Sequence, residues 1–277
     1  MDSVEPIRER EGKRLFRIVL DGSSYILKVF GHTEASREVR AYSLLEDLGV
    51  PTLRVIARTN DALLLEDLDV SEHLRLATEE DVGKVEAGAA LAVWYRALHN
   101  AGSAVRLGVD PRSSFLPREI DALTPASILE IAALVRGSDR KKWSILAGNI
   151  DRIRNAVMAS AETLTYNDFH WTNLALSRDG KPPRAVVFDY HLLGLGMRHS
   201  DCRNVTGSRG PDAADAFRSA YGETNPGEKV LDELVAPLCA LVEAFQRHRF
   251  PSWAKASLKL AETGEIHNRL DRVIEIM

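Results

Sequence analysis

The sequence lacks the features that mark several protein classes. Only two cysteines, Cys202 and Cys239, occur among its 277 residues, which excludes a disulfide framework and a cysteine-rich zinc site. No apolar run approaches the roughly 20 residues that a membrane-spanning helix needs. Basic residues number 36 against 40 acidic ones, a net charge of −4. We therefore expect neither a nucleic-acid partner, which selects basic surfaces, nor a membrane partner.

Motifs of other enzyme classes are missing as well. The chain has no GxSxG, HExxH or CxxC pattern, and its eight histidines are scattered. The first ten residues are charged and lack the apolar stretch of a signal peptide. Together with an ordinary hydrophobic content of 45%, these absences predict a globular cytoplasmic protein.

Apolar and β-branched runs dominate the first 66 residues. Asp21-Gly22 follows the first of two such runs, 15–20 and 25–30, and this pattern predicts a β-hairpin. Helical apolar spacing follows at 34–48 and stops at Gly49. Three further strands are expected. One precedes the hairpin and is joined to it by a tight loop at Gly12, and the other two span 53–57 and 62–65.

From about residue 67 the pattern becomes helical. Thr78 and Asp81 resemble a capping box, and the helix after them should run to about His99 and close at Gly102. Further helices are expected after the Thr124-Pro125 cap up to Gly137, and at 141–161, 211–221, 228–249 and 252–277. We therefore divide the chain into a β-rich lobe, 1–66, and a helical lobe, 67–277.

Residues 164–191 interrupt this helical pattern and organise the rest of the chain. They read as two β-hairpins in succession, with Asp168 and Asn173 in the first loop and Asp189 at the end of the last strand. This set suits metal-assisted phosphoryl transfer: one carboxylate accepts a hydroxyl proton, while the amide and the other carboxylate hold Mg²⁺. Each residue alone could instead cap a turn or end a strand.

Two charged residues upstream fit the same chemistry. Lys28 has apolar neighbours in its predicted strand, and Glu38 lies ten residues later in the predicted helix. Taken alone, each is most simply a solvent-facing charge. As an ion pair between strand and helix, they would hold an ammonium group against the phosphates of a nucleotide. The nucleotide is then expected between the two lobes.

The order of these residues resembles the aminoglycoside phosphotransferase and choline kinase family, which has the protein-kinase-like fold. The resemblance covers roughly residues 10–205, and it implies an α+β, bilobal fold with a small β-rich N-lobe and a larger helical C-lobe. The matching segments are YILKVF at 25–30, REVRAYSLLEDLGVP at 37–51, LLLEDL at 63–68, LAVWYRALH at 91–99, YNDFHWTN at 166–173, VVFDY at 186–190 and HSDCRNV at 199–205, with Asp201 at the place of a structural aspartate.

The resemblance also implies the role of each candidate site residue. Asp168 matches the catalytic aspartate, and Asn173 and Asp189 match the ligands of Mg²⁺. For ATP, the resemblance implies that Lys28 contacts the phosphates with Glu38 as its helix partner. It further implies that the backbone at Glu66 and Leu68 binds adenine.

Two departures from the family pattern stand out. Residues 10–14, REGKR, carry no GxGxxG, so phosphate contacts would come from backbone N–H groups near Gly12 and from Lys28. The family often has His-Gly before the catalytic aspartate, whereas this chain has Tyr166-Asn167. The second departure puts the usual support of the catalytic loop in question.

The function predicted on this basis is ATP-dependent phosphorylation of a small-molecule hydroxyl, of the aminoglycoside phosphotransferase type associated with antibiotic resistance. Residues 103–162 and 211–277, the expected substrate helices, show no pattern that selects one substrate. Residues 66–81 contain seven acids and one arginine, which either attract a cationic substrate or form solvated surface. The alternative is a catalytically silent kinase-fold protein that binds a nucleotide or a partner, and the intact five-residue set argues against it.

Overall fold

A computed structural model describes residues 2–10, 12–31, 37–104, 110–137, 139–160, 162–180 and 183–277. The chain forms two compact units, each described by itself below. Unit 1 comprises Met1–Phe115, Tyr166–Leu193 and Cys202–Glu223, and unit 2 comprises Leu116–Thr165, Gly194–Asp201 and Thr224–Met277. The predicted lobe boundary between residues 66 and 67 lies inside unit 1 and stays a prediction.

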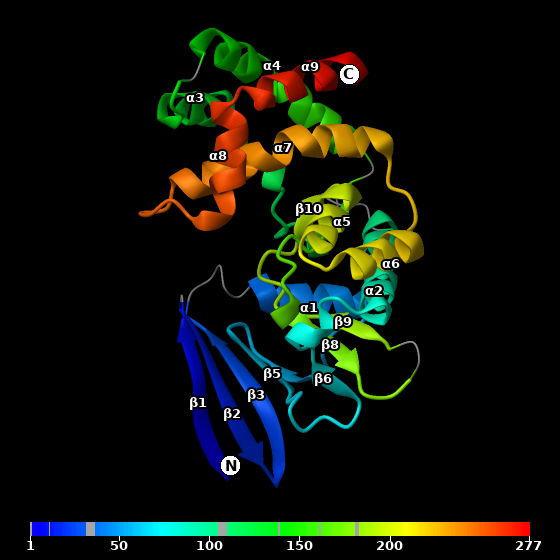
Figure 1. Cartoon of the computed structure of the whole chain (residues 1–277). Coiled ribbons are helices and arrows are strands. Elements are labelled where there is room, and N and C mark those ends of the chain that lie inside the picture. The colour runs from blue at the N-terminus through cyan, green and yellow to red at the C-terminus, as the bar shows by residue number, and fades with distance from the viewer. Residues whose placement is uncertain are drawn as a thin grey trace. The chain divides into compact units, whose positions relative to one another are not determined.

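Unit 1 begins with a five-stranded antiparallel sheet in the order β1-β2-β3-β5-β4 (Figure 1). The predicted hairpin is confirmed, because Asp21 and Gly22 have φ values of 49° and 75°, the left-handed conformation that a tight hairpin turn needs. The predicted strands of this region are all present: β1 (Ser3–Arg10), β2 (Lys13–Leu20), β3 (Ser23–Phe30), β4 (Val55–Arg58) and β5 (Ala62–Glu66).

The helix predicted at 34–48 is α1 (Arg37–Asp47), whose first expected residues lie outside the described part of the chain. Val39, Tyr42 and Leu45 are buried along one face, as their helical spacing predicts. The chain leaves the helix through Gly49 at φ 70°. Helix α1 thereby places Glu38 in its first turn, on the buried side.

The strand pairing of the central segment differs from the prediction. The second hairpin is present, as β8 (Leu174–Ser177) with β9 (Ala185–Val187) in unit 1. The first hairpin is wrong: in unit 2, β7 (Thr163–Thr165) pairs with β10 (Gly194–Gly196). Strand β8 pairs instead with β6 (Leu74–Leu76), which the sequence did not reveal because three residues are too short for a recognisable alternation.

Helix α2 (Val85–Ala104) packs against α6 (Pro211–Tyr221) in unit 1. A Cβ atom at Gly88 would lie 2.1 Å from the carbonyl oxygen of Ala213, so this contact requires glycine. The carboxylate of Asp81 does accept from the backbone N–H of Thr78, but the turn it caps is the 3₁₀ turn η1 (Glu79–Asp81). Helix α2 starts later than predicted and continues through Gly102.

Unit 2 is mainly helical. The Thr124 cap is confirmed, because its hydroxyl oxygen accepts a hydrogen bond from the backbone N–H of Ser127. The single helix predicted at 252–277 is instead interrupted at Gly264, which has φ 79°. Buried apolar residues such as Trp143, Ile150 and Leu238 form its core. Its elements are η3 (Glu119–Ala122), α3 (Pro125–Leu134), α4 (Arg140–Ala159), α7 (Pro226–Phe245), η5 (Ser252–Ala254), α8 (Lys255–Glu262) and α9 (Glu265–Ile276).

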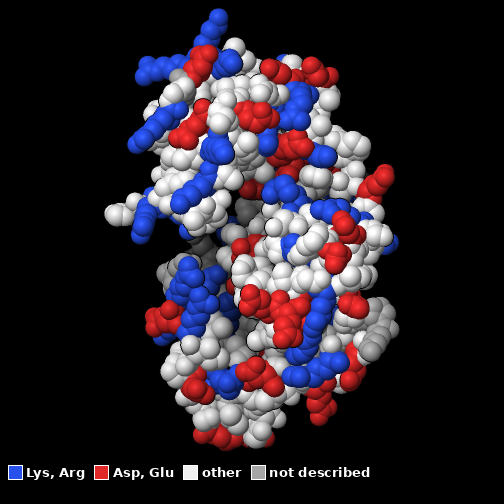
Figure 2. Space-filling view, viewed as in Figure 1, with Lys and Arg blue, Asp and Glu red and all other residues white. Residues whose placement is uncertain are grey.

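Three further short elements complete the chain: η2 (Pro111–Ser113), η4 (Trp171–Asn173) and α5 (Arg198–Gly207). The structure has an antiparallel sheet at its N-terminus followed by a mostly helical remainder, which confirms the predicted α+β class. Basic and acidic side chains are interspersed over the face seen in Figure 2, and neither sign dominates it. Across the described ranges, every helix is too short or too polar to cross a membrane.

Candidate active site

Lys28 lies on β3 in unit 1 and forms two ion pairs. Its Nζ is 2.7 Å from Glu38 on α1 and 2.7 Å from Asp189, which follows β9. Burial lowers the pKa of Lys28, but the two carboxylates outweigh burial and raise this pKa, so the ammonium stays charged. Lys28 and Glu38 are 7% and 1% exposed, so the alternative that both face solvent is wrong.

Asp189 combines an ion pair with an unusual backbone. Its φ of 67° lies in the left-handed region, a strained conformation for a non-glycine residue that is concentrated at functional sites. Oδ1 contacts Nζ of Lys28 and lies 3.2 Å from Nδ1 of His191, while Oδ2 has no partner among the described residues. Burial raises the pKa of Asp189, but these partners overcome burial and hold that pKa far below its usual range.

His191 links Asp189 to the predicted catalytic aspartate. Its Nε2 lies 3.8 Å from Oδ2 of Asp168, which accepts no hydrogen bond from any described residue. Burial raises the pKa of Asp168, with the charge of His191 opposing the shift. Sequence reasoning left the role of His191 open between a metal ligand and a solvent-exposed or substrate-facing side chain; in the structure it lies between the two aspartates.

Asn173 ends the 3₁₀ turn η4 and is held by Tyr166. The amide Nδ2 of Asn173 donates to the Tyr166 hydroxyl at 3.1 Å, and this hydroxyl donates to the carbonyl of Phe188 at 2.6 Å. The amide nitrogen is therefore engaged, and Oδ1 remains to accept or coordinate. Because Phe188 precedes Asp189, one hydroxyl ties both predicted metal ligands together.

Tyr166 and Asn167 explain how this chain replaces the His-Gly of the family pattern. Tyr166 is fully buried, and its ring lies edge-on to Trp94 and Tyr190 at centroid distances of 6.0 and 6.1 Å. Asn167 has φ 66°, which asparagine tolerates better than most non-glycine residues, and its side chain donates to the carbonyl of Leu192. The loop thus has support from this chain's own residues.

Glu66 and Leu68 lie at the end of β5 and just after it. The carboxylate of Glu66 accepts from the backbone N–H of Arg54 at 2.8 Å and the hydroxyl of Ser71 at 3.2 Å. Leu68 is buried, and its backbone N–H donates to no other described residue. An N–H of this kind suits an adenine acceptor, and the adenine role of this segment stays a prediction.

Two buried carboxylates of the acidic segment 66–81, Asp67 and Asp81, are paired with basic side chains. Asp67 accepts from Arg17 and from Ser24, each at 2.7 Å. Asp81 is bonded by Arg75 at 2.7 Å and by Lys84 at 2.9 Å. Internal pairing leaves less net charge to attract a cationic substrate than the residue count indicates.

The donor set decides which metal fits. The parts of the chain that the structure describes contain no group of three His, Cys, Asp or Glu side chains suited to a metal ion. The candidate ligands are instead one carboxylate and one amide oxygen, from Asp189 and Asn173. Such a set suits Mg²⁺, which keeps several waters and uses one or two protein oxygens together with substrate phosphates.

Sequence comparison places this geometry in a family. The profile of the phosphotransferase enzyme family (APH) matches residues 3–234, which include all seven predicted site residues. No curated protein sequence matches the chain at a significant level.

Comparison with solved structures gives the fold. A choline/ethanolamine kinase family protein from Mesorhizobium loti aligns with a TM-score of 0.62 and 16% identity, covering 98% of this chain and 92% of its own. The macrolide 2′-phosphotransferase MphH from Brachybacterium faecium aligns with a TM-score of 0.58 and 14% identity, and the alignment covers 94% of this chain and 91% of that protein. APH(2″)-IIa in its ternary complex with streptomycin and ATP aligns with a TM-score of 0.51 and 13% identity, and the alignment covers 96% of this chain and 90% of that protein.

Proposed function

Because the chain belongs to the phosphotransferase enzyme family, we propose that it is an ATP-dependent kinase that phosphorylates a hydroxyl group of a small molecule. One observation carries this proposal. An unbroken chain of titratable side chains runs from Glu38 through Lys28, Asp189 and His191 to Asp168, with successive contacts between 2.7 and 3.8 Å. A kinase-fold protein without activity has no need to keep this arrangement.

Asp168 is the proposed proton acceptor. Its carboxylate is partly exposed, makes no hydrogen bond to a described residue, and has a raised pKa, all of which suit a group that must take a proton from an incoming hydroxyl. The hydroxyl oxygen then forms the new bond to the γ-phosphorus, and the bond to the ADP oxygen breaks. Such transfer depends mainly on positioning and charge.

Asn173 and Asp189 are the proposed holders of Mg²⁺. The Oδ2 of Asp189, which no described residue contacts, and the Oδ1 of Asn173 are the oxygens available for this purpose, and the Tyr166 hydroxyl fixes the amide. Mg²⁺, when bound, supplies charge neutralisation for the phosphates. Tyr166 is therefore a positioning residue that acts through Asn173 and through the backbone beside Asp189.

Lys28 is the proposed phosphate contact, and Glu38 holds its ammonium in place. Lys13 lies nearby, with its Nζ 3.9 Å from Asp189, and it follows the Gly12 loop that would supply backbone N–H groups to the phosphates. The segment at Glu66 and Leu68 would bind adenine through its backbone. These contacts together replace the missing glycine motif.

We propose a hydroxyl-bearing antibiotic or metabolite as the acceptor, with aminoglycosides as the first class to test. The similar structures include proteins whose names specify choline, ethanolamine, macrolide or aminoglycoside substrates, at 12–16% identity, so the choice among these classes depends on experiment.

The test is a substrate panel read by mass spectrometry. The purified protein with Mg²⁺ and ATP is incubated with aminoglycosides, macrolides, choline and ethanolamine, and each compound is examined for the gain of one phosphate group. We expect phosphorylation of at least one hydroxyl compound, absent without Mg²⁺. Tight Mg²⁺-dependent ATP binding without transfer to any member of a broad panel would favour the silent alternative.

A further inference from the structure

A second cavity in unit 1 lies on the opposite side of the sheet from Lys28. Side chains alternate along β3, and Tyr25, which pairs with Glu66, points to the other face from Lys28, which pairs with Leu63. The cavity has a volume of about 1150 Å³ and is lined by both Tyr25 and Glu66. Neither Asp168, Asn173 nor Asp189 contributes to it. The cavity therefore excludes the proposed reacting groups and shares only Glu66 with the candidate site, whose backbone is the proposed adenine contact.

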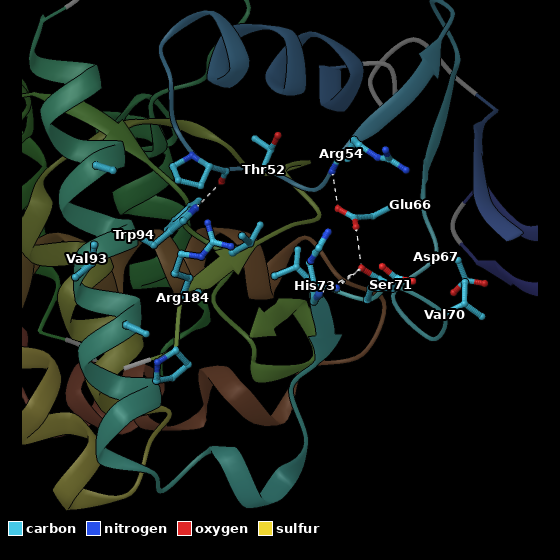
Figure 3. A pocket seen from close by; sticks show the side chains of 18 of the residues that line it. Thr52, Arg54, Glu66, Asp67, Val70, Ser71, His73, Val93, Trp94 and Arg184 are labelled. Carbon is cyan, nitrogen blue, oxygen red and sulfur yellow. Dashed lines mark hydrogen bonds between the residues drawn. The ribbon is translucent and has the colours of Figure 1, made fainter. Parts of the chain in front are cut away.

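Helix α2 gives this cavity an apolar wall. Ala89, Ala90, Val93 and Ala97 line it with small side chains, so the wall is shallow and leaves room for a ligand body. Trp94 lies on the same side (Figure 3), and its indole N–H is already bonded to the carbonyl of Pro51 at 2.8 Å. The wall thus presents apolar surface without an unsatisfied donor.

The charged groups around the cavity are unequally satisfied. Glu66 has partners on both carboxylate oxygens, and Asp67 is bonded by Arg17 and Ser24. Arg54 and Arg184, in contrast, have no ion pair or side-chain hydrogen bond to any described residue. Glu72 is the one lining carboxylate without a described partner, and it is exposed. The partners of Glu66 are a backbone N–H and a hydroxyl, so Glu66 and Glu72 both lack a described cation, and the two lining arginines do not outnumber them. The positive charge is therefore local to the part of the cavity that Arg184 lines.

Figure 3 shows how these groups are arranged. Arg184, which directly precedes β9, extends beside Trp94 and Val93, while Glu66 and Ser71 lie on the other side. A guanidinium next to an apolar wall can bind an anionic group whose apolar body rests on that wall. Cavities that hold small ligands typically measure roughly 300–1,000 Å³, and this one, slightly larger, has room for a molecule of metabolite size.

We propose that this cavity is a binding site for a small organic anion with an apolar body, in which Arg184 pairs with the anionic group and the α2 wall contacts the body. The proposal does not depend on the kinase reaction. Arg184 is exposed and its side chain bonds to no described residue, so its guanidinium is accessible to a ligand.

Two fluorescent probes of the same shape test this proposal. 8-Anilinonaphthalene-1-sulfonate carries an anionic group, and N-phenyl-1-naphthylamine is the same body without it. We expect the sulfonate to bind the wild-type protein more tightly than the neutral probe. Arg184→Gln should weaken binding of the sulfonate by about tenfold, which corresponds to the loss of one charge-assisted hydrogen bond. The affinity for the neutral probe should change by less than about twofold.

Matched variants complete the experiment. Arg218→Gln removes an exposed arginine that does not line the cavity and should change neither affinity. Val93→Glu places a carboxylate on the exposed wall, where Val93 is 64% accessible, and should weaken the sulfonate further. The proposal is overturned if Arg184→Gln binds the sulfonate like the wild type, or if the wild type does not prefer the sulfonate over the neutral probe.

Discussion

Two aspartates of unit 1, Asp81 and Asp189, share a strongly depressed pKa and basic partners, yet they differ in every other respect. Asp81 is 1% exposed, and both of its oxygens are saturated by Arg75, Lys84 and Thr78. All these partners lie within six residues of it. Its backbone carbonyl also accepts from Arg209. This is a local network that fixes a turn.

Asp189 is built differently. Its side chain is 29% exposed, one oxygen has no partner in the described part of the chain, its backbone is left-handed, and its Lys28 partner is 161 residues away in the sequence. A depressed pKa therefore does not identify a catalytic site by itself. Accessible and unsaturated oxygen atoms, held by partners from distant elements, distinguish the candidate reaction centre from a structural ion pair.

Of the substitutions that test this comparison, Asp168→Asn should have the largest effect on turnover. The amide cannot accept a proton, so we expect turnover to fall by about a thousandfold or more, within the range for loss of a general base. Nucleotide affinity should change little, because Asp168 has no contact to Lys28. Steady-state kinetics and ATP titration measure the two quantities. Asp179→Asn, at an exposed loop position, is the control, and turnover equal to the wild type in Asp168→Asn would reject the assignment.

Lys28→Met should have the next largest effect on catalysis. The thioether fills a similar volume but leaves Glu38 buried without its cation and removes the phosphate contact. We expect kcat/KM to fall by about 100–1,000-fold, comparable to losing a charge-stabilising donor. A change confined to the melting temperature, with kcat/KM intact, would make Lys28 a purely structural residue.

Tyr166→Phe tests the hydroxyl that joins the two predicted metal ligands. Loss of a group that orients metal ligands typically costs about 10–100-fold in metal affinity or activity. We expect the Mg²⁺ concentration for half-maximal activity to rise by this factor. Tyr42→Phe is the matched control, because its buried hydroxyl has no described partner. Equal Mg²⁺ dependence in both variants would show that Tyr166 is merely a packing residue.

Asp81→Asn should leave the chemistry unchanged and affect stability alone. Loss of charge-assisted hydrogen bonds at a buried site should lower the free energy of unfolding by about 2–3 kcal/mol. Because the folded-state pKa of Asp81 is depressed, its stabilisation is present above the ordinary pKa of about 3.9 and lost as pH falls below it. Denaturant unfolding at several pH values should show the wild-type advantage shrinking only in acid, and an advantage that grows in acid would contradict the assignment.

Much of the candidate site could be predicted because its residues, weak signals one by one, occur together in an order that serves one chemistry. Asp168, Asn173 and Asp189 adjoin short apolar strands, and Lys28 and Glu38 occupy a strand and a helix with clear periodicity. The pairing of β7 with β10 could not be predicted, since three-residue strands carry no information about their partners. The strand β6 was missed for the same reason.

Contacts between distant residues were also beyond sequence reasoning. The contact of His191 with Asp168 and that of the Tyr166 hydroxyl with Phe188 depend on where the chain meets itself after folding, because each joins residues more than 20 positions apart. The departure from His-Gly at 166–167 was the available signal. The cavity behind β5 left no trace in the sequence, because small alanines and one arginine are common on any helix or strand.

The most direct test of the central claim is the Mg²⁺ dependence of ATP binding in the wild type and in Asp189→Ala, measured by calorimetry with a non-hydrolysable analogue. If Asp189 is a metal ligand facing Lys28, Mg²⁺ should strengthen binding to the wild-type protein and have no such effect on the variant. Equal strengthening by Mg²⁺ in both proteins would contradict the account.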